Sequence, residues 1–143
     1  MREAPGTVRE CAGGRGRKLF RLLIFVWWTG NGDMHLENFS LLRGEDGNYR
    51  LSPAYDLLCT RLVIGDDPLA LSVGGKKKNV THRQWMQFAE KCGIRPRVAE
   101  GIVRSVVIAT DDATALIARS ALPDEMKSTY ETLIRSRAKS LRR

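Results

Sequence analysis

The chain has 143 residues, of which 43% are hydrophobic and 28% charged, a composition typical of one globular domain rather than a disordered or membrane-spanning chain. Its 24 basic and 16 acidic residues give a formal net charge of +8, which favours acidic partners. Much of the excess lies near the two ends, where charges are usually solvated, so direct nucleic-acid binding is not expected.

The first predicted element is a flexible basic leader over residues 1–17, which are rich in glycine and arginine. Residues 18–28 are apolar nearly all round and predict a buried helix that Gly30 ends, although a strand remains an alternative. Trp27 and Trp28 are expected in the core or against another lobe, near an exposed apolar patch.

A β-hairpin is predicted next, because the short runs "NFSLLR" and "YRLSP" flank the turn-rich linker "GEDGN". The run "LALSV" at 69–73 predicts a third short strand before the loop "GGKKKN". The hairpin and the later helices are expected to form a core by themselves, whereas the apolar face of residues 18–28 is expected to need a further lobe.

The remaining sequence predicts helices. Thr81 and Gln84 form a capping-box pair, and Gly93 closes the helix that follows. Pro96 marks the first turn of a longer helical stretch that breaks near "TDD", and a last helix starts at Pro123. The sequence shows no internal repeat and no sign of a second domain.

The cysteines argue for a reducing compartment. Cys11, Cys59 and Cys92 are odd in number and far apart, which favours neither a disulfide framework nor a zinc site. Basic residues precede the apolar run as in a secretory signal, but the run contains Arg21 and leads into "TGNGD" instead of a cleavage site. A cytoplasmic location without membrane contact is therefore expected.

A polar cluster in "TGNGDMHLENFSLL" at 29–42 separates two apolar segments. Asn38 follows Asp33 by five positions, and Asp56 follows Asp33 by 23, across the predicted hairpin. In protein kinases an aspartate at the first position accepts the proton of the attacking hydroxyl, while the asparagine and the second aspartate bind magnesium. Two structural alternatives stay open. The Asn-Gly and Gly-Asp pairs could simply form turns, with Asp56 capping a helix, and His35 could be a hydrogen-bonded structural histidine.

The motif "GNGDMHLENFSLL" followed by "YRLSPAYDLL" resembles the catalytic core of the HipA family of bacterial serine/threonine kinases, the toxins of toxin–antitoxin pairs. More loosely, the resemblance extends over residues 18–141. It implies a mainly α fold over residues 18–143, the helical C-terminal lobe of a protein-kinase-like fold with a small β-hairpin at the catalytic site.

The resemblance also implies roles for individual residues. Asp33 corresponds to the catalytic base, and His35 to a catalytic-loop histidine that steadies the loop or approaches the γ-phosphate. Asn38 and Asp56 correspond to the ligands of Mg²⁺, and through it of ATP. Glu37 departs from the family, where many relatives carry lysine, and would weaken nucleotide binding if its side chain faced the site.

A second departure concerns length, because family members run to several hundred residues and place a glycine-rich phosphate loop and a strand lysine before the catalytic loop. Only 32 residues precede Asp33 here, and "AGGRGRK" at 12–18 lacks the flanking strands of such a loop. The sequence is therefore expected to be a C-terminal lobe from a truncated gene, a pseudogene or a frameshifted reading frame, and inactive alone.

Two functions follow as hypotheses. The first is transfer of the ATP γ-phosphate to a protein serine or threonine, with aminoacyl-tRNA synthetases as implied substrates and an antitoxin-like DNA-binding protein as partner. The second is a non-catalytic module that binds an antitoxin-like partner or nucleic acid. Lysines 76–78 are expected in a solvated loop, the alternative being contact with an acidic protein substrate or a nucleotide phosphate.

Overall fold

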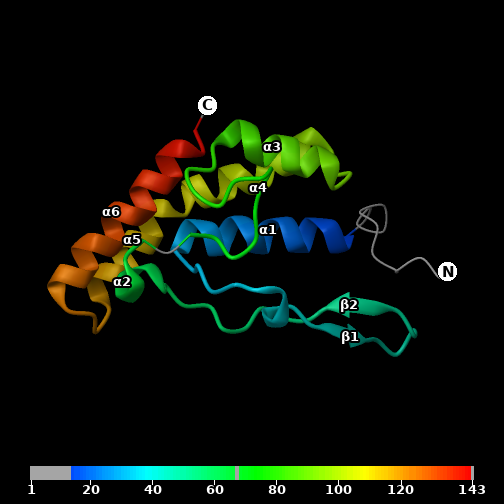
Figure 1. Ribbon diagram of the computed structural model, residues 1–143, viewed down its shortest axis with the longest axis horizontal. Coiled ribbons are helices and arrows are strands. Elements are labelled where there is room, and N and C mark those ends of the chain that lie inside the picture. The colour runs from blue at the N-terminus through cyan, green and yellow to red at the C-terminus, as the bar shows by residue number, and fades with distance from the viewer. Residues whose placement is uncertain (1–13, 67, 143) are drawn as a thin grey trace.

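The computed structural model describes residues 14–66 and 68–142 and is mainly helical. The elements follow in this order: α1 (Gly14–Thr29), η2 (Leu36–Asn38), β1 (Leu41–Arg43), β2 (Tyr49–Leu51), α2 (Arg61–Ile64), α3 (His82–Lys91), α4 (Pro96–Ile108), α5 (Thr110–Arg119) and α6 (Asp124–Ser140). Figure 1 shows the longer helices gathered into one body, with the β1–β2 hairpin extending from it. The predicted mainly α fold with a small hairpin is confirmed.

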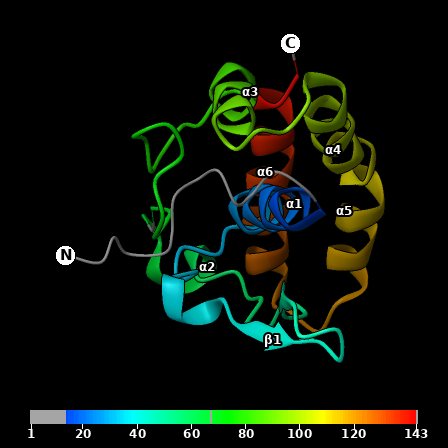
Figure 2. The same cartoon turned by 90° about the vertical axis from the view of Figure 1, so that its right-hand side faces the viewer.

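Helix α1 is the central element of this body. Viewed nearly along α1, the other long helices lie around it on several sides, with β1 below (Figure 2), and α1 contacts α4, α6 and β2. The helix begins at Gly14, so residues 14–17 of the predicted leader are helical, and residues 1–13 lie outside the described part. The helical interpretation of residues 18–28 is confirmed, and the strand alternative is wrong.

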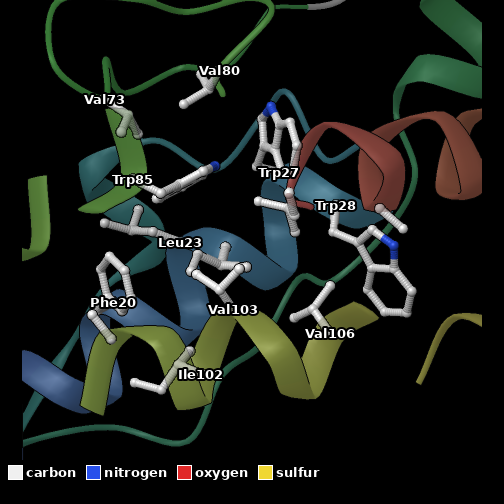
Figure 3. Packing of buried hydrophobic residues seen from close by; sticks show 14 of the residues in the cluster. Phe20, Leu23, Trp27, Trp28, Val73, Val80, Trp85, Ile102, Val103 and Val106 are labelled. Carbon is white, nitrogen blue, oxygen red and sulfur yellow. The ribbon is translucent and has the colours of Figure 1, made fainter. Parts of the chain in front are cut away.

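Aromatic side chains from α1 and α3 form the centre of the core (Figure 3). Trp85 is fully buried, and its ring meets Phe20 and Trp27 edge to face at centroid distances of 5.9 and 5.7 Å. Trp27 and Trp28 are only 3% and 4% exposed. The core interpretation of both tryptophans is therefore confirmed.

The expected exposed apolar surface nearby is not formed by the tryptophans. It surrounds Phe25, whose ring lies 6.2 Å from that of Trp28, and continues to Leu57. Together with neighbouring residues of α1 and of the segment after β2, these two side chains line an open groove of about 510 Å³. One face of α1 is thus partly uncovered, while Phe20, Ile24 and Trp27 of the same helix are buried.

The hairpin is present but does not form a core. Strands β1 and β2 pair antiparallel, with Leu42 opposite Arg50, and nearly all their side chains are exposed. The expectation that the hairpin belongs to a self-sufficient core is therefore wrong. Helix α1 packs against α4 and α6 but leaves the face around Phe25 uncovered, so whether that face needs a further lobe stays a prediction. An apolar strand residue is buried only when another element packs on it. No described element covers Leu41 or Leu42.

The third strand predicted at 69–73 is also absent. Val73 is buried but makes only an isolated bridge with Lys76. Gly74 and Gly75 both have positive φ and turn the chain back at once, so the run has no partner strand. Its apolar residues instead pack on the helical core.

The C-terminal helices follow the prediction closely. The N–H of Thr81 donates to Gln84 Oε1 at 2.9 Å as α3 begins, and α4 starts at Pro96. The long helical stretch breaks at Ala109, directly before the "TDD" segment that opens α5. Helix α6 begins directly after Pro123.

The expectations on disulfides and on membrane spans can be compared with the described residues. Cys59 and Cys92 form no disulfide in the part of the chain that the structure describes, whereas Cys11 lies outside it. Within the described ranges, no helix combines the length and apolar character needed to cross a bilayer.

Candidate active site

The candidate site begins at the turn that ends α1. Gly30 has φ of 83°, and a Cβ placed there would lie 2.7 Å from Leu133 Cδ2 and 2.8 Å from Cys59 Sγ. Only glycine combines this left-handed backbone with so close an approach to α6. The turn therefore fixes where the polar loop leaves the core.

Asn31 connects this loop to the segment beyond the hairpin. Its side chain is 2% exposed, and its Oδ1 accepts a hydrogen bond from the N–H of Asp33 at 3.1 Å. Its Nδ2 donates to the carbonyl of Asp56 at 3.0 Å. One buried amide thus holds the backbones of Asp33 and Asp56 together, although 23 positions separate them in sequence.

Thr60 makes a second connection. Its buried hydroxyl accepts from the N–H of Gly32 at 2.8 Å and donates to the carbonyl of Gly30 at 3.3 Å. The N–H of Arg61 also donates to the carbonyl of Gly30. The segment after Asp56 is therefore bonded to the turn that precedes Asp33.

Three of the predicted site residues lie in one hydrogen-bonded loop. His35 Nε2 lies 3.2 Å from Asp33 Oδ1, and both side chains are 61% exposed. Asn38, at the end of η2, donates through Nδ2 to the backbone carbonyl of Asp33 at 2.8 Å. Asn38 Oδ1 accepts no hydrogen bond from the described residues, so this oxygen is available to coordinate a metal ion.

Asp56, the fourth predicted residue, is exposed and has φ of 54°. Such a backbone is uncommon for a non-glycine residue and often marks a functional site. Within the described ranges its carboxylate makes no ion pair and no hydrogen bond to Asn38. No helix begins at Asp56, since the next one, α2, starts at Arg61 after Thr60, so the helix-cap alternative is wrong. Convergence of the Asp56 and Asn38 oxygens on one cation stays a prediction.

Tyr55 closes the base of the hairpin. Its hydroxyl donates to the carbonyl of Glu37 at 3.0 Å and shares a hydrogen bond of 2.8 Å with Ser40 Oγ. The N–H of Ser52 donates to the carbonyl of Ser40 as well. The side chain of Glu37 is exposed, and it is the backbone of this residue that contributes to the site.

Sequence reasoning missed Asn31, Tyr55 and Thr60. Asn31 was hidden in an Asn-Gly pair that is common in turns, and its position between two glycines, directly after a buried helix, was the available signal. Nothing local distinguishes Tyr55 or Thr60, because their partners lie 18 and 28 positions away.

Behind the turn, Cys59 and Tyr130 are partly buried. Burial raises the pKa of the Cys59 thiol, and burial together with Cys59 raises the pKa of Tyr130 to about 12. Both groups are therefore neutral near pH 7, and Cys59 lacks the thiolate that a nucleophile needs.

The oxygen donors of Asn38 and Asp56 fit magnesium by their chemistry, since Mg²⁺ prefers hard oxygen ligands. Among the described residues, no three His, Cys, Asp or Glu side chains gather as a metal-binding group. Magnesium in nucleotide sites is commonly held by one or two carboxylates with water and substrate phosphates. The donor set therefore fits a magnesium–nucleotide complex better than a dedicated metal cage.

Comparison with known proteins finds three relatives that are all named as putative kinases. "Putative kinase Y4dM" of Sinorhizobium fredii is 47% identical over 62 residues, which cover 43% of this chain and 15% of that protein. "Putative kinase Y4mE" of the same organism is 31% identical over 106 residues, covering 70% and 24%. A "Putative kinase" of Haemophilus influenzae is 38% identical over 42 residues, covering 29% and 12%. The matched regions are thus a quarter or less of each relative's length.

A solved structure shares the fold. It is a chain in the complex of the Shewanella oneidensis MR-1 toxin–antitoxin system HipA and HipB with operator DNA, at a TM-score of 0.67 and 19% identity. The match covers 87% of this chain and 31% of that chain. The family model described as the HipA-like C-terminal domain matches residues 3–114. The resemblance read from the motifs is therefore confirmed, and the chain belongs to the HipA-like C-terminal domain family.

Proposed function

We propose that this chain is the C-terminal catalytic lobe of a HipA-like kinase that transfers the ATP γ-phosphate to a protein serine or threonine. The observation that carries the proposal is the pair of hydrogen bonds from Asn31 to the backbones of Asp33 and Asp56. Those bonds hold together the two segments whose aspartates act in kinases as proton acceptor and metal ligand.

Asp33 is suited to act as the general base. Its carboxylate is exposed, so an incoming hydroxyl can reach it, and only Oδ1 contacts His35. Oδ2 has no hydrogen-bond partner among the described residues and is open to a substrate proton. His35 then steadies the carboxylate, and a base held within hydrogen-bond reach of its proton contributes about 10²–10⁴-fold to rate.

Asn38 and Asp56 are suited to hold the magnesium–nucleotide complex. Asn38 uses its nitrogen on the carbonyl of Asp33, which fixes the amide and orients its oxygen away from that bond. The Asp56 carboxylate supplies a second hard oxygen donor. When bound, the ion neutralises charge on the β- and γ-phosphates.

The 143-residue polypeptide alone is proposed to be inactive. Kinase catalysis also requires a glycine-rich loop and a strand lysine that hold the phosphates in line, and strands β1 and β2 carry no lysine. Misplacement of reacting groups by about 1 Å can cost on the order of a hundredfold in rate. The lobe therefore needs a partner lobe of the kind its longer relatives have room for.

Partners are proposed by analogy with the family. The Shewanella complex contains HipB and operator DNA, so an antitoxin-like DNA-binding protein is the expected partner of a kinase with this lobe. The expected substrate is a protein, with aminoacyl-tRNA synthetases as the first panel to test, in the cytoplasm.

The test joins this chain to the N-terminal portion of a kinase from the same family and measures transfer from labelled ATP with Mg²⁺. Asp33→Asn should lower turnover by about 10²–10⁴-fold if Asp33 is the base. Asp46→Asn is the matched control, since Asp46 is exposed in the hairpin turn and bonds Asn48 and Arg50. An unchanged rate in Asp33→Asn refutes the base assignment. DNA binding that falls steeply with salt, without nucleotide binding, supports the non-catalytic alternative.

A further inference from the structure

A second polar pocket lies apart from the catalytic loop, between α6 and the segment from Arg61 to Thr81. Its volume is about 370 Å³, and none of Asp33, His35, Asn38 or Asp56 lines it. The lining residues that matter for its chemistry are Arg61, Asp66, Lys77, Lys78, Ser136 and Arg137.

The lining carries four cations and one carboxylate, which leaves three positive charges in excess. Lys78 forms an ion pair with Asp66, and this hydrogen bond holds the pKa of the Asp66 carboxyl below its usual value. Asp66 therefore stays ionised at neutral pH, and these two charges offset each other. The net positive charge resides on the other three cations.

Those three cations are presented in different ways. Arg137 is held in place, because its guanidinium donates to the backbone carbonyl of Trp27 and lies 5.4 Å over the Trp27 ring. Within the described part of the chain, the side chains of Arg61 and Lys77 make no hydrogen bond and no ion pair. The three positive charges around this pocket repel each other, so an anion bound between them would stabilise their placement.

The charge of the lining favours phosphate over a carboxylate. A phosphomonoester carries a charge of about −1.5 to −2 near neutral pH, whereas a carboxylate carries a single negative charge, so the phosphomonoester better balances three cations in excess. Arginine and lysine both bind phosphate oxygens through charged N–H groups. Ser136 adds a hydroxyl to the same wall. The volume is within the range of about 300–1,000 Å³ typical of small-molecule sites, which leaves room for a group attached to the anion.

We propose that this pocket binds a phosphomonoester group, presented by a phosphorylated serine side chain or as the free ion. The proposal does not depend on the kinase function, because none of the candidate catalytic residues lines the pocket. It also separates the three lysines of the loop, since Lys77 would contact the anion, Lys78 is paired, and Lys76 does not line the pocket.

The test is calorimetric titration of the 143-residue chain with O-phosphoserine, inorganic phosphate and unphosphorylated serine. The two phosphate probes should bind and serine should not. Lys77→Gln and Arg61→Gln should each weaken binding by about threefold to tenfold, as expected for loss of a partly exposed charged hydrogen bond. Lys76→Gln is the matched control and should change affinity by less than about twofold.

Asp66→Asn gives the sharpest arm, because removing this carboxylate frees Lys78 and should tighten binding by a few fold. A misfolded variant does not gain affinity, so this arm cannot be imitated by loss of structure. Tighter binding of O-phosphoserine than of phosphate supports a phosphorylated protein as the source, and equal binding supports the free ion. No saturable response to either phosphate probe, or equal losses in Lys76→Gln and Lys77→Gln, overturns the proposal.

Discussion

The helical body and the hairpin region treat apolar side chains in opposite ways. In the body, Phe20, Ile24 and Trp85 are at most 1% exposed. In the loop and hairpin that follow α1, Leu36, Leu41 and Leu42 are 72%, 62% and 55% exposed. Burial stabilises a side chain by about 1.5–3 kcal/mol, so the body holds most of the folding free energy and the hairpin contributes little.

The difference shows how the candidate site is built. Its functional groups lie in the weakly packed region, and buried polar side chains of the well-packed region hold them in place. Asn31 and Thr60 make these connections from positions beside the ends of α1 and α2. Binding and catalytic residues are commonly found on loops that a rigid scaffold positions, and here the scaffold is α1 with the helices around it.

The largest expected effect that separates the two regions comes from removing an aromatic ring from each. Trp85→Ala should lower the free energy of unfolding by about 3–5 kcal/mol, because it empties the centre of the core. Tyr49→Ala in β2 should lower it by less than about 0.5 kcal/mol, since that ring is exposed. Urea unfolding of both variants measures the difference, and similar losses would show that the hairpin shares the core's stability.

The next effect compares two glycines with positive φ. Gly30→Ala should cost about 2–4 kcal/mol, because it adds a left-handed backbone penalty to overpacking against Leu133 and Cys59. Gly47→Ala in the hairpin turn meets nothing within 4 Å, so only the backbone penalty of about 1–2 kcal/mol remains. Equal losses in urea unfolding would mean that the turn after α1 is not tightly packed.

A smaller effect is expected at Asp56, whose backbone is left-handed. Asp56→Gly should be more stable than Asp56→Ala by about 1 kcal/mol, because glycine adopts positive φ without the steric cost of a Cβ. Both variants remove the carboxylate and should abolish transfer in the joined kinase. Thermal unfolding measures the stability, and equal values for the two variants would argue that Asp56 leaves this conformation readily in solution.

Prediction from sequence succeeded where the signal is local. The pair Thr81 and Gln84 and the proline at position 96 each depend on residues within one helical turn. The strand predicted at 69–73 failed because a strand needs a partner, and the chain turns back at Gly74. The burial of the hairpin failed for a related reason, since apolar strands do not reveal what covers them.

The hydrogen-bond partners of the residues that hold the site together could not be predicted, for the same physical reason. Asn31, Tyr55 and Thr60 act through hydrogen bonds to residues 25, 18 and 28 positions away. Such partners follow from the path of the chain around the hairpin, and no local pattern encodes them. The polar pocket between α6 and the segment from Arg61 to Thr81 could not be predicted from local sequence either, because α6 supplies Arg137 while a distant loop supplies Lys77.

The most direct test of the proposed site is paramagnetic broadening by Mn²⁺, a cation suited to the same oxygen ligands as Mg²⁺. In two-dimensional NMR spectra of the 143-residue chain, the amide signals of Asn38 and Asp56 should broaden first. Asp56→Asn should suppress the effect, and Asp46→Asn should leave it unchanged. Broadening centred on Asp46 or Asp66, or broadening at Asn38 that persists in Asp56→Asn, would contradict a shared metal site at Asn38 and Asp56.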